Sequence, residues 1–186
     1  MNIAILGGRF DPPHIFHFWT AQQVLEHSGN IDQVWYLPDY QNAFKTIVAS
    51  VEDRLEMLRS IETGRIKTSR VGIKEQTVTY TVGVVNELIK DTANRYFWIV
   101  GSDILSEFSK WRDYQRLTRL ITFLVMPRKD FPIKQIPAGF KRIEGNLMLS
   151  NVSSTIIRDR VRRGLTIAGL VFPETEEYIR KRNLYK

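Results

Sequence analysis

Short apolar runs alternate with segments of helical periodicity along most of the chain. We predict strands where Ile, Val, Leu and aromatic residues dominate, at residues 2–6, 33–37, 66–73, 96–100, 121–126 and 147–149. Apolar spacings of three and four predict helices from His14 to a stop at Gly29, from Ser50 to a stop at Gly64, and over residues 81–90, 102–118, 154–163 and 173–183. Residues 129–145, which contain prolines and glycines, are predicted to form a loop.

This order of elements predicts an α/β fold. Strands that alternate with helices form parallel sheets with right-handed crossovers, so we expect a doubly wound, Rossmann-like sheet with a short α-helical C-terminal extension. The continuous apolar runs at 96–100 and 121–126 are typical of strands covered on both faces. We expect a single domain over residues 1–186, with its helical part at roughly 151–186. Ligands of such folds bind at the carboxyl ends of the strands.

The spacing of apolar residues also predicts which helix faces are buried. Ser50 and Asp53 resemble a capping box at the start of a helix whose inward residues would be Leu55, Leu58 and Ile61. In the helix over 81–90 the inward residues would be Val84, Val85, Leu88 and Ile89. The helix over 102–118 is expected to break or bend near Lys110–Trp111.

Composition excludes several classes of protein. The chain has 186 residues, of which 43% are apolar and 25% charged, as in ordinary globular domains. It has no cysteine, so disulfides and thiolate metal sites are excluded. The N-terminus lacks a basic region, and its apolar run is too short for a signal peptide or a membrane span. We therefore expect a cytoplasmic protein that does not bind membranes.

A formal net charge of +7 favours anionic partners. Charge alone does not distinguish nucleic acid, anionic lipid and polyphosphate nucleotides. The sequence contains no recognised nucleic-acid motif, so nucleic acid is not the expected partner. Much of the excess lies late in the chain, at Arg158, Arg160, Arg162, Arg163, Arg180, Lys181, Arg182 and Lys186. The alternative interpretation of these residues is a set of solvated helix faces.

The first strand leads through Gly7-Gly8-Arg9-Phe10-Asp11-Pro12-Pro13-His14-Ile15-Phe16-His17 into the first helix. Glycines let backbone N–H groups approach an anion, and a helix N-terminus adds partial positive charge. His14 and His17 are three residues apart and can both donate to phosphate oxygens. The segment matches neither the dinucleotide fingerprint nor the Walker P-loop. A plain turn with two surface histidines is the structural alternative.

A second cluster, Asn151-Val152-Ser153-Ser154-Thr155-Ile156-Ile157-Arg158, precedes another predicted helix. The structural interpretation of this cluster is a helix N-cap, for which either Ser153 or Ser154 is suitable. Its functional interpretation is a second anion site, in which hydroxyl groups and the guanidinium of Arg158 bind phosphate oxygens.

Together, the two clusters resemble the nucleotidyltransferase superfamily, and within it the bacterial nicotinate-nucleotide adenylyltransferases. The resemblance covers nearly the whole chain. It also includes Leu37-Pro38 with Lys45, Arg54-Leu55-Glu56-Met57, Thr79-Tyr80-Thr81, Val100-Gly101-Ser102-Asp103 with Trp111, Pro127-Arg128, Val171-Phe172-Pro173, Tyr178-Ile179 and Leu184-Tyr185. Phosphopantetheine adenylyltransferases share the two phosphate motifs but are shorter and lack the Asp-to-Trp segment.

The resemblance implies transfer of AMP from ATP to nicotinate mononucleotide, with pyrophosphate released, as a step of NAD biosynthesis. It implies Mg²⁺ that bridges ATP phosphates without dedicated protein ligands. The catalytic residues would be His14, His17 and Arg158. The ATP-binding residues would be Gly7, Gly8, Arg9, Phe10, Gly101, Asp103, Ser153, Ser154 and Thr155. The acceptor-binding residues would be Thr81, Trp111, Lys45 and Arg128, with Trp111 on the pyridine ring and Thr81 beside its carboxylate.

Structural alternatives apply to three of these residues. Trp111 could be a core aromatic, Asp103 a helix-start residue favoured by the dipole, and Lys45 a solvated loop lysine. His27, at the far end of the first helix, is expected to be exposed and uninvolved. The oligomeric state is left open, a homo-oligomer included.

Phe16 departs from the family pattern, which has glycine between the two histidines. A phenyl ring there could fill the nucleotide's space, point away, or stack on the base. The departure leaves open a nucleotide-binding protein of this fold without turnover, and a phosphopantetheine-type adenylyltransferase is a further alternative. Class I aminoacyl-tRNA synthetases have similar paired histidines, but this chain is too short for their tRNA-binding parts.

Overall fold

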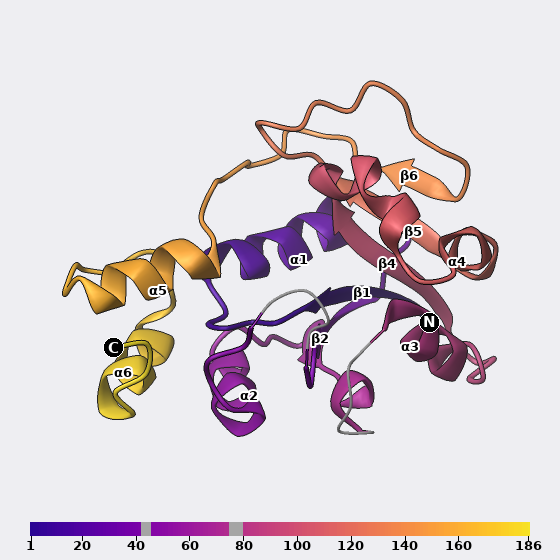
Figure 1. The fold of residues 1–186 in the computed structure, drawn as a ribbon. Coiled ribbons are helices and arrows are strands. Elements are labelled where there is room, and N and C mark those ends of the chain that lie inside the picture. The colour runs from indigo at the N-terminus through magenta and orange to yellow at the C-terminus, as the bar shows by residue number, and fades with distance from the viewer. Residues whose placement is uncertain (42–45, 75–79) are drawn as a thin grey trace.

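The computed structural model describes residues 1–41, 46–74 and 80–186 (Figure 1). Its strands are β1 (Asn2–Gly8), β2 (Gln33–Pro38), β3 (Ile66–Thr68), β4 (Arg95–Gly101), β5 (Thr122–Met126) and β6 (Phe140–Arg142). They form one six-stranded sheet in the order β3-β2-β1-β4-β5-β6, and every pair is parallel. This order reverses between β1 and β4, which confirms the predicted doubly wound, Rossmann-like sheet.

The helices connect these strands. The α-helices are α1 (Ile15–His27), α2 (Val51–Arg59), α3 (Thr81–Leu88), α4 (Tyr114–Leu120), α5 (Ser154–Arg162) and α6 (Pro173–Lys181). Shorter 3-10 turns are η1 (Val71–Ile73), η2 (Ser102–Ser106) and η3 (Phe108–Lys110). Across the parts of the chain that the structure describes, no helix is both long and apolar enough to cross a membrane.

Alternating residues of the strands point to opposite faces of the sheet, and a separate apolar core covers each face. Ile3 and Ile5 of β1 face the core that α3 and α4 cover. Ala4, between them, faces the core that α1 and α2 cover. Helices therefore pack on both faces, which is why the central strands are uniformly apolar.

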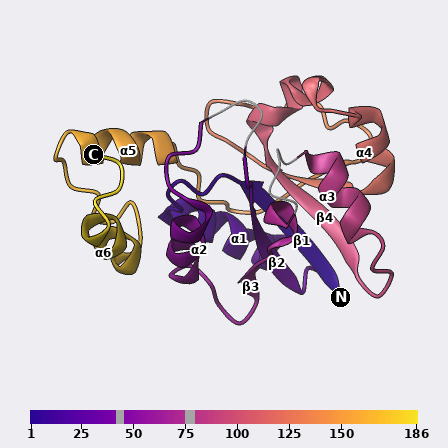
Figure 2. The ribbon, with the colours of Figure 1, turned by 60° about the horizontal axis from the view of Figure 1, so that its bottom comes forward.

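The C-terminal helices α5 and α6 lie beside one end of the sheet in both views (Figures 1 and 2). A third apolar core joins them to α2 through Met57, Ile157 and Ile179. Tyr185, the penultimate residue, and Ala49 belong to the same core. The segment after β2 and the end of the chain are thus packed together.

Two predictions for residues 129–149 are wrong. The predicted loop contains β6, because Phe140 packs on the Phe108 and Phe123 rings at centroid distances of 4.8 and 4.9 Å. The predicted strand at 147–149 is absent, and a side chain in place of a neighbouring strand makes the backbone hydrogen bonds there. Gln23, a buried residue of α1, accepts from the Met148 N–H and donates to the Met148 carbonyl, at 2.5 and 3.3 Å.

Three other elements are shorter than predicted, and one of them is α2, which ends at Arg59 and not near Gly64. The strand over 66–73 ends at Thr68, and the chain turns into η1 after the Ser69 N–H donates to the Tyr36 carbonyl at 2.8 Å. The helix over 102–118 is replaced by η2, η3 and the short α4. The break predicted near Lys110–Trp111 is confirmed, because η3 ends at Lys110 and Trp111 has extended backbone angles, and α4 begins after Asp113, whose φ of 53° is left-handed.

The predicted buried faces need two corrections. On α2 the buried residues are Asp53, Arg54, Met57 and Leu58, while Leu55 is half-buried, so the packed face includes two charged side chains. On α3, Val84, Val85 and Leu88 are buried as predicted, but Ile89 follows the last helical residue and is 37% exposed. The Ser50 cap is confirmed, because its side chain accepts from the Asp53 N–H at 3.0 Å.

Candidate active site

The sequence motifs meet at the carboxyl edge of the sheet. The segment of residues 7–14, called the motif loop below, leaves β1 and leads into α1. Gly101 ends the neighbouring strand β4, and Arg128 follows β5. This is the point where the strand order reverses, and parallel sheets of this type bind ligands there.

His14 and His17 stack on each other at the start of α1, with ring centroids 3.6 Å apart. The His14 backbone N–H donates to His17 Nδ1 at 3.0 Å. That bond fixes the His17 tautomer, because a nitrogen that accepts carries no proton. His17 Nε2 therefore carries the hydrogen and is a donor. Nδ1 of His14 is buried and has no hydrogen-bond partner among the described residues.

Both histidines are neutral at physiological pH. Burial, with the nearby charge of Arg128, lowers the pKa of His14 from 6.5 to about 3. Burial, with the charges of His14 and Arg128, lowers the pKa of His17 well below its ordinary value. The pair can thus offer N–H donors without carrying positive charge of its own.

The low pKa of His14 predicts a loss of stability in acid. The unfolded chain binds a proton at His14 near pH 6.5, and the folded chain only near pH 3. The contribution of neutral His14 to the free energy of unfolding is therefore fully present above pH 6.5, and it is lost as the pH falls towards 3. At pH 5 this one group costs about 2 kcal/mol, at about 1.4 kcal/mol per pH unit. Urea unfolding at pH 7 and pH 5 measures the loss. His14→Asn, which does not titrate, should lose about 2 kcal/mol less over that interval, and an equal loss would contradict the assignment.

The start of α5 is attached to the motif loop. Ser153 is its N-cap and accepts from the Ile156 N–H at 3.3 Å, which confirms the capping interpretation. The Ser154 hydroxyl donates to the Pro12 carbonyl at 2.8 Å. Arg158 donates through Nη1 to the Asp11 carbonyl at 2.7 Å and through Nη2 to the Thr155 hydroxyl at 3.4 Å. The two sequence clusters therefore form one site.

Two guanidinium groups approach each other at this junction. Burial lowers the pKa of Arg9, and the positive charge of Arg158 lowers it further, while Asp11 and Asp39 act in the opposite direction. Arg9 also donates to the Thr46 carbonyl at 3.2 Å. Like charges held close are stabilised when an anion binds between them, so this arrangement suits a phosphate group.

Three residues of the motif loop have packing roles. A Cβ atom on Gly7 would lie 2.7 Å from the Trp98 ring, so glycine is needed there for close packing. Phe10 is buried, with its ring 4.8 Å from that of His17 and 5.4 Å from that of Tyr36. The Gly8 carbonyl accepts from the Asp39 N–H at 3.0 Å.

Gly101, Asp103 and Arg128 form the opposite side of the site. Arg128 Nε lies 3.0 Å from Asp103 Oδ1. A Cβ atom on Gly101 would clash with Asp103 Oδ1 and Arg128 Nε, so the ion pair lies directly over this glycine. Arg128 is also close enough to lower the pKa values of both histidines.

Thr81 and Trp111 are in adjoining segments. Thr81 is the first residue of α3, and Trp111 follows η3 with its ring 5.3 Å from that of Phe108. Their neighbours in sequence touch, since the Arg112 guanidinium lies 5.0 Å from the Tyr80 ring centroid. Trp111 is half-buried and packs against the core, so the core interpretation of this side chain accounts for part of its surface.

Lys45, the remaining predicted acceptor residue, lies outside the described residues. Phe16 is half-buried on the first turn of α1 and belongs to none of the three apolar cores. Phe18 packs on Trp19 and Phe172, at 5.6 and 5.4 Å, and no ring contact joins Phe16 to a described aromatic side chain. The structure therefore does not place Phe16 as a core residue beside Phe18 and Trp19.

Two residues that support the site had no predicted role. Asp11 is fully buried, and its carboxylate accepts from the Val48 and Ala49 N–H groups at 2.7 and 3.0 Å. Arg54 is 1% exposed and donates to the Arg9 carbonyl at 2.8 Å. The sequence did contain a signal for Arg54. It is a charged residue three positions before Met57 and four before Leu58, and so lies on the apolar side of α2.

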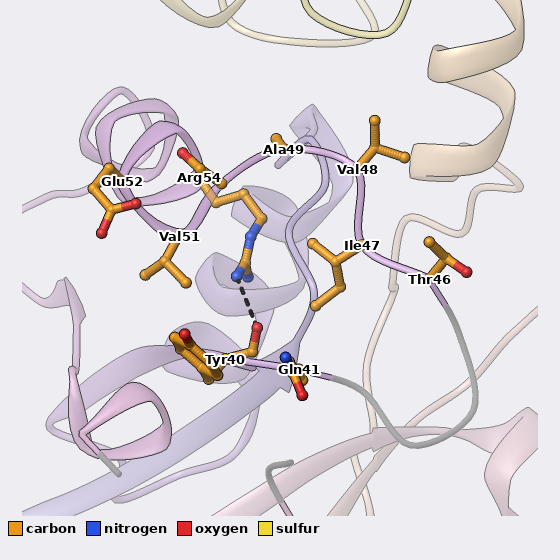
Figure 3. A pocket seen from close by; sticks show the side chains of 10 residues that line it. Tyr40, Gln41, Thr46, Ile47, Val48, Ala49, Val51, Glu52 and Arg54 are labelled. Carbon is orange, nitrogen blue, oxygen red and sulfur yellow. Dashed lines mark hydrogen bonds between the residues drawn. The ribbon is translucent and has the colours of Figure 1, made fainter. Parts of the chain in front are cut away.

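A cavity of about 780 Å³ adjoins the motif loop (Figure 3). The described residues that line it come from the segment after β2 and from the start of α2, and neither motif histidine is among them. Arg54 crosses one side of the cavity and donates to the Tyr40 carbonyl at 3.5 Å (Figure 3). Arg54 thus holds both the motif loop and the segment that follows β2.

The fold and the paired phosphate motifs define a nucleotidyltransferase. The sequence model of the cytidylyltransferase-like family matches residues 5–160. A protein of Opitutus terrae named "Probable nicotinate-nucleotide adenylyltransferase" is 34% identical, over 100% of this chain and 98% of its own. One of the same name from Halalkalibacterium halodurans is 32% identical, over 100% of this chain and 91% of its own. The chain belongs to the nicotinate-nucleotide adenylyltransferase family.

A solved structure agrees on the fold. Nicotinic acid mononucleotide adenylyltransferase of Plasmodium falciparum, complexed with NaAD, matches with a TM-score of 0.84. The match covers 99% of this chain and 97% of that one, at 21% sequence identity. The sheet and its helices are therefore those of this enzyme fold.

Proposed function

We propose that this protein transfers the adenylyl group of ATP to nicotinate mononucleotide, giving nicotinate adenine dinucleotide and pyrophosphate. Membership of the family supports the reaction. The observation that carries the site assignment is the convergence of Arg9, Arg158 and the two neutral histidines at the carboxyl end of β1. These groups offer donors and positive charge to an ATP triphosphate.

The reaction needs no covalent enzyme intermediate. A phosphate oxygen of the mononucleotide attacks the α-phosphorus of ATP in line, a P–O bond to the acceptor forms, and the P–O bond to pyrophosphate breaks. His17 Nε2–H and the Arg158 guanidinium donate to oxygens whose negative charge grows in the transition state. Catalysis then rests on positioning and charge stabilisation, and neutral histidines supply donors that do not lose protons near pH 7.

Mg²⁺ fits this site as a companion of ATP. Among the described residues, no group of three or more His, Asp or Glu side chains could hold a metal ion. Asp103 pairs with Arg128, and the Asp11 carboxylate is already occupied by backbone N–H donors. We therefore propose that Mg²⁺ binds through the ATP phosphates, where it would neutralise charge on the leaving pyrophosphate.

Pyrophosphate release from ATP tests the function. We expect release with nicotinate mononucleotide and a specificity constant at least about tenfold lower with the amide analogue, because donors arranged for a carboxylate are mismatched by an amide. Phosphopantetheine serves as the control acceptor and should give no release. Equal specificity constants for the two pyridine nucleotides would remove the acceptor assignment alone.

The same assay separates the second candidate, a nucleotide-binding protein without turnover. Phe16 motivates this candidate, since it occupies a position where the family has glycine. ATP binding without pyrophosphate release, whatever the acceptor, would favour it over the enzyme.

A further inference from the structure

The penultimate residue of the chain is buried. Tyr185 is 6% exposed, and its ring packs in the third apolar core with Ala49 and Ile157. Its φ of 64° is left-handed, a conformation that a residue with a side chain adopts only at a steric cost. Chain ends are ordinarily exposed and frayed unless tertiary contacts hold them. The end of this chain is therefore held by specific contacts.

The Tyr185 hydroxyl donates to Asp11 Oδ1 at 2.9 Å, in the middle of the motif loop. The same carboxylate accepts from the Val48 and Ala49 N–H groups, at 2.7 and 3.0 Å. Burial and the neighbouring Asp11 raise the pKa of Tyr185, so its hydroxyl keeps the proton that it donates. Among the described residues the Asp11 carboxylate thus has three hydrogen-bond donors, one of which comes from the far end of the chain.

Asp11 in turn holds Arg158. The Asp11 backbone carbonyl accepts from Arg158 Nη1 at 2.7 Å, and its carboxylate oxygen Oδ2 lies 4.0 Å from the same nitrogen. His14 follows Asp11 by three residues. Asp11 therefore links Tyr185 to the Arg158 guanidinium within the motif loop.

We propose that Tyr185 is a positioning residue of the ATP site, whose hydroxyl sets the orientation of Asp11 and through it that of Arg158. This inference rests on the proposed function, because it takes Arg158 and His14 as phosphate-binding groups. The physical reason is the burial of the Asp11 carboxylate. A fully buried carboxylate that loses a hydrogen-bond donor must reorient or shift its loop, because bringing in a water molecule to replace the donor costs free energy. Because Arg158 is assigned to the ATP phosphates, the shift should act mainly on ATP binding.

The same C-terminal segment contains a matched control. The Tyr178 hydroxyl donates to Asp53 Oδ1 at 2.8 Å. Asp53 lies on α2 and accepts from Ser50, so this second tyrosine–aspartate pair joins α6 to α2 and does not touch the motif loop. Removing either hydroxyl deletes one hydrogen bond to a carboxylate.

The experiment compares Tyr185→Phe with Tyr178→Phe, because phenylalanine keeps the ring and removes only the hydroxyl. Calorimetric titration with ATP and Mg²⁺ gives the affinity, and steady-state kinetics gives KM for each substrate. We expect Tyr185→Phe to weaken ATP binding and raise the KM for ATP by about fivefold to tenfold, the size of one ordinary lost hydrogen bond, with a smaller change in the KM for nicotinate mononucleotide. Tyr178→Phe should lower the melting temperature and leave both KM values unchanged.

Tyr185→Phe with unchanged ATP affinity, or Tyr178→Phe with an equal loss of it, would overturn the inference. A merely structural role would lower the active fraction, and hence kcat, while leaving both KM values unchanged. The affinity measurement needs no turnover. A wild-type chain that binds ATP but releases no pyrophosphate therefore overturns the proposed function alone, and one that binds no ATP overturns both.

Discussion

His17→Ala is expected to lower kcat/KM by roughly a hundred- to a thousandfold, as removal of a single preorganised charge-stabilising donor does in other enzymes. The reason is local. Nδ1 of His17 is used by the His14 N–H, so Nε2–H is the proton that this ring can donate to a transferring phosphate. Because His17 is neutral, the loss should be similar across pH 7 to 8. Pyrophosphate release at saturating nicotinate mononucleotide measures it.

Two further variants isolate the donor. His17→Asn keeps an acceptor where Nδ1 lies, and so keeps the bond to His14, but has no group in place of Nε2. It should be as inactive as His17→Ala. His27→Ala removes the exposed histidine at the other end of the same helix and should keep the wild-type rate. A His17→Asn protein with near wild-type activity would show that the His17 Nε2–H does not face the reacting phosphate.

The parts of the fold that were predictable have strong local signals. The runs at 96–100 and 121–126 became the interior strands β4 and β5, because strands covered on both faces must be apolar throughout. Ser50 and Ser153 begin α2 and α5 because a serine hydroxyl satisfies a free backbone N–H in the first turn. An apolar run and a capping serine can each be recognised from a few consecutive residues.

The parts that were missed depend on distant contacts. β6 is three residues long and exists because the Phe140 ring stacks on Phe123, which no local pattern shows. Residues 147–149 are as apolar as a strand, yet Gln23 satisfies the backbone there from 125 positions away. A short apolar run is therefore weak evidence that a segment pairs with another strand.

The same distinction applies to the site. His14, His17 and Arg158 could be named from motifs, and the structure brings their segments together. Asp11 was visible within the motif, but its carboxylate is satisfied by Val48, Ala49 and a tyrosine 174 positions along the chain. The residues that position a site are selected by the folded geometry, and their roles appear only when that geometry is known.

Phe16→Gly is expected to tighten ATP binding by about ten- to a hundredfold, the equivalent of the 1–3 kcal/mol that an intruding side chain costs in a packed site. Phe16 lies one residue before His17 on the first turn of α1, half-buried and outside the three apolar cores. Because its ring belongs to none of these cores, we expect it to be available to intrude on a nucleotide at the helix start. Glycine at this position should cost up to about 1 kcal/mol of helix stability.

Calorimetric ATP titration and thermal unfolding of Phe16→Gly measure both quantities on one variant, with Phe18→Gly as the comparison. Phe18 packs on Trp19 and Phe172, so its loss should lower the melting temperature more than the loss of Phe16 does. Tighter ATP binding with slightly lower stability in Phe16→Gly means that the phenyl ring narrows the nucleotide site. Weaker ATP binding would mean the opposite, that the ring stacks on the adenine base and contributes to the affinity for ATP. Phe16 would then be a binding residue.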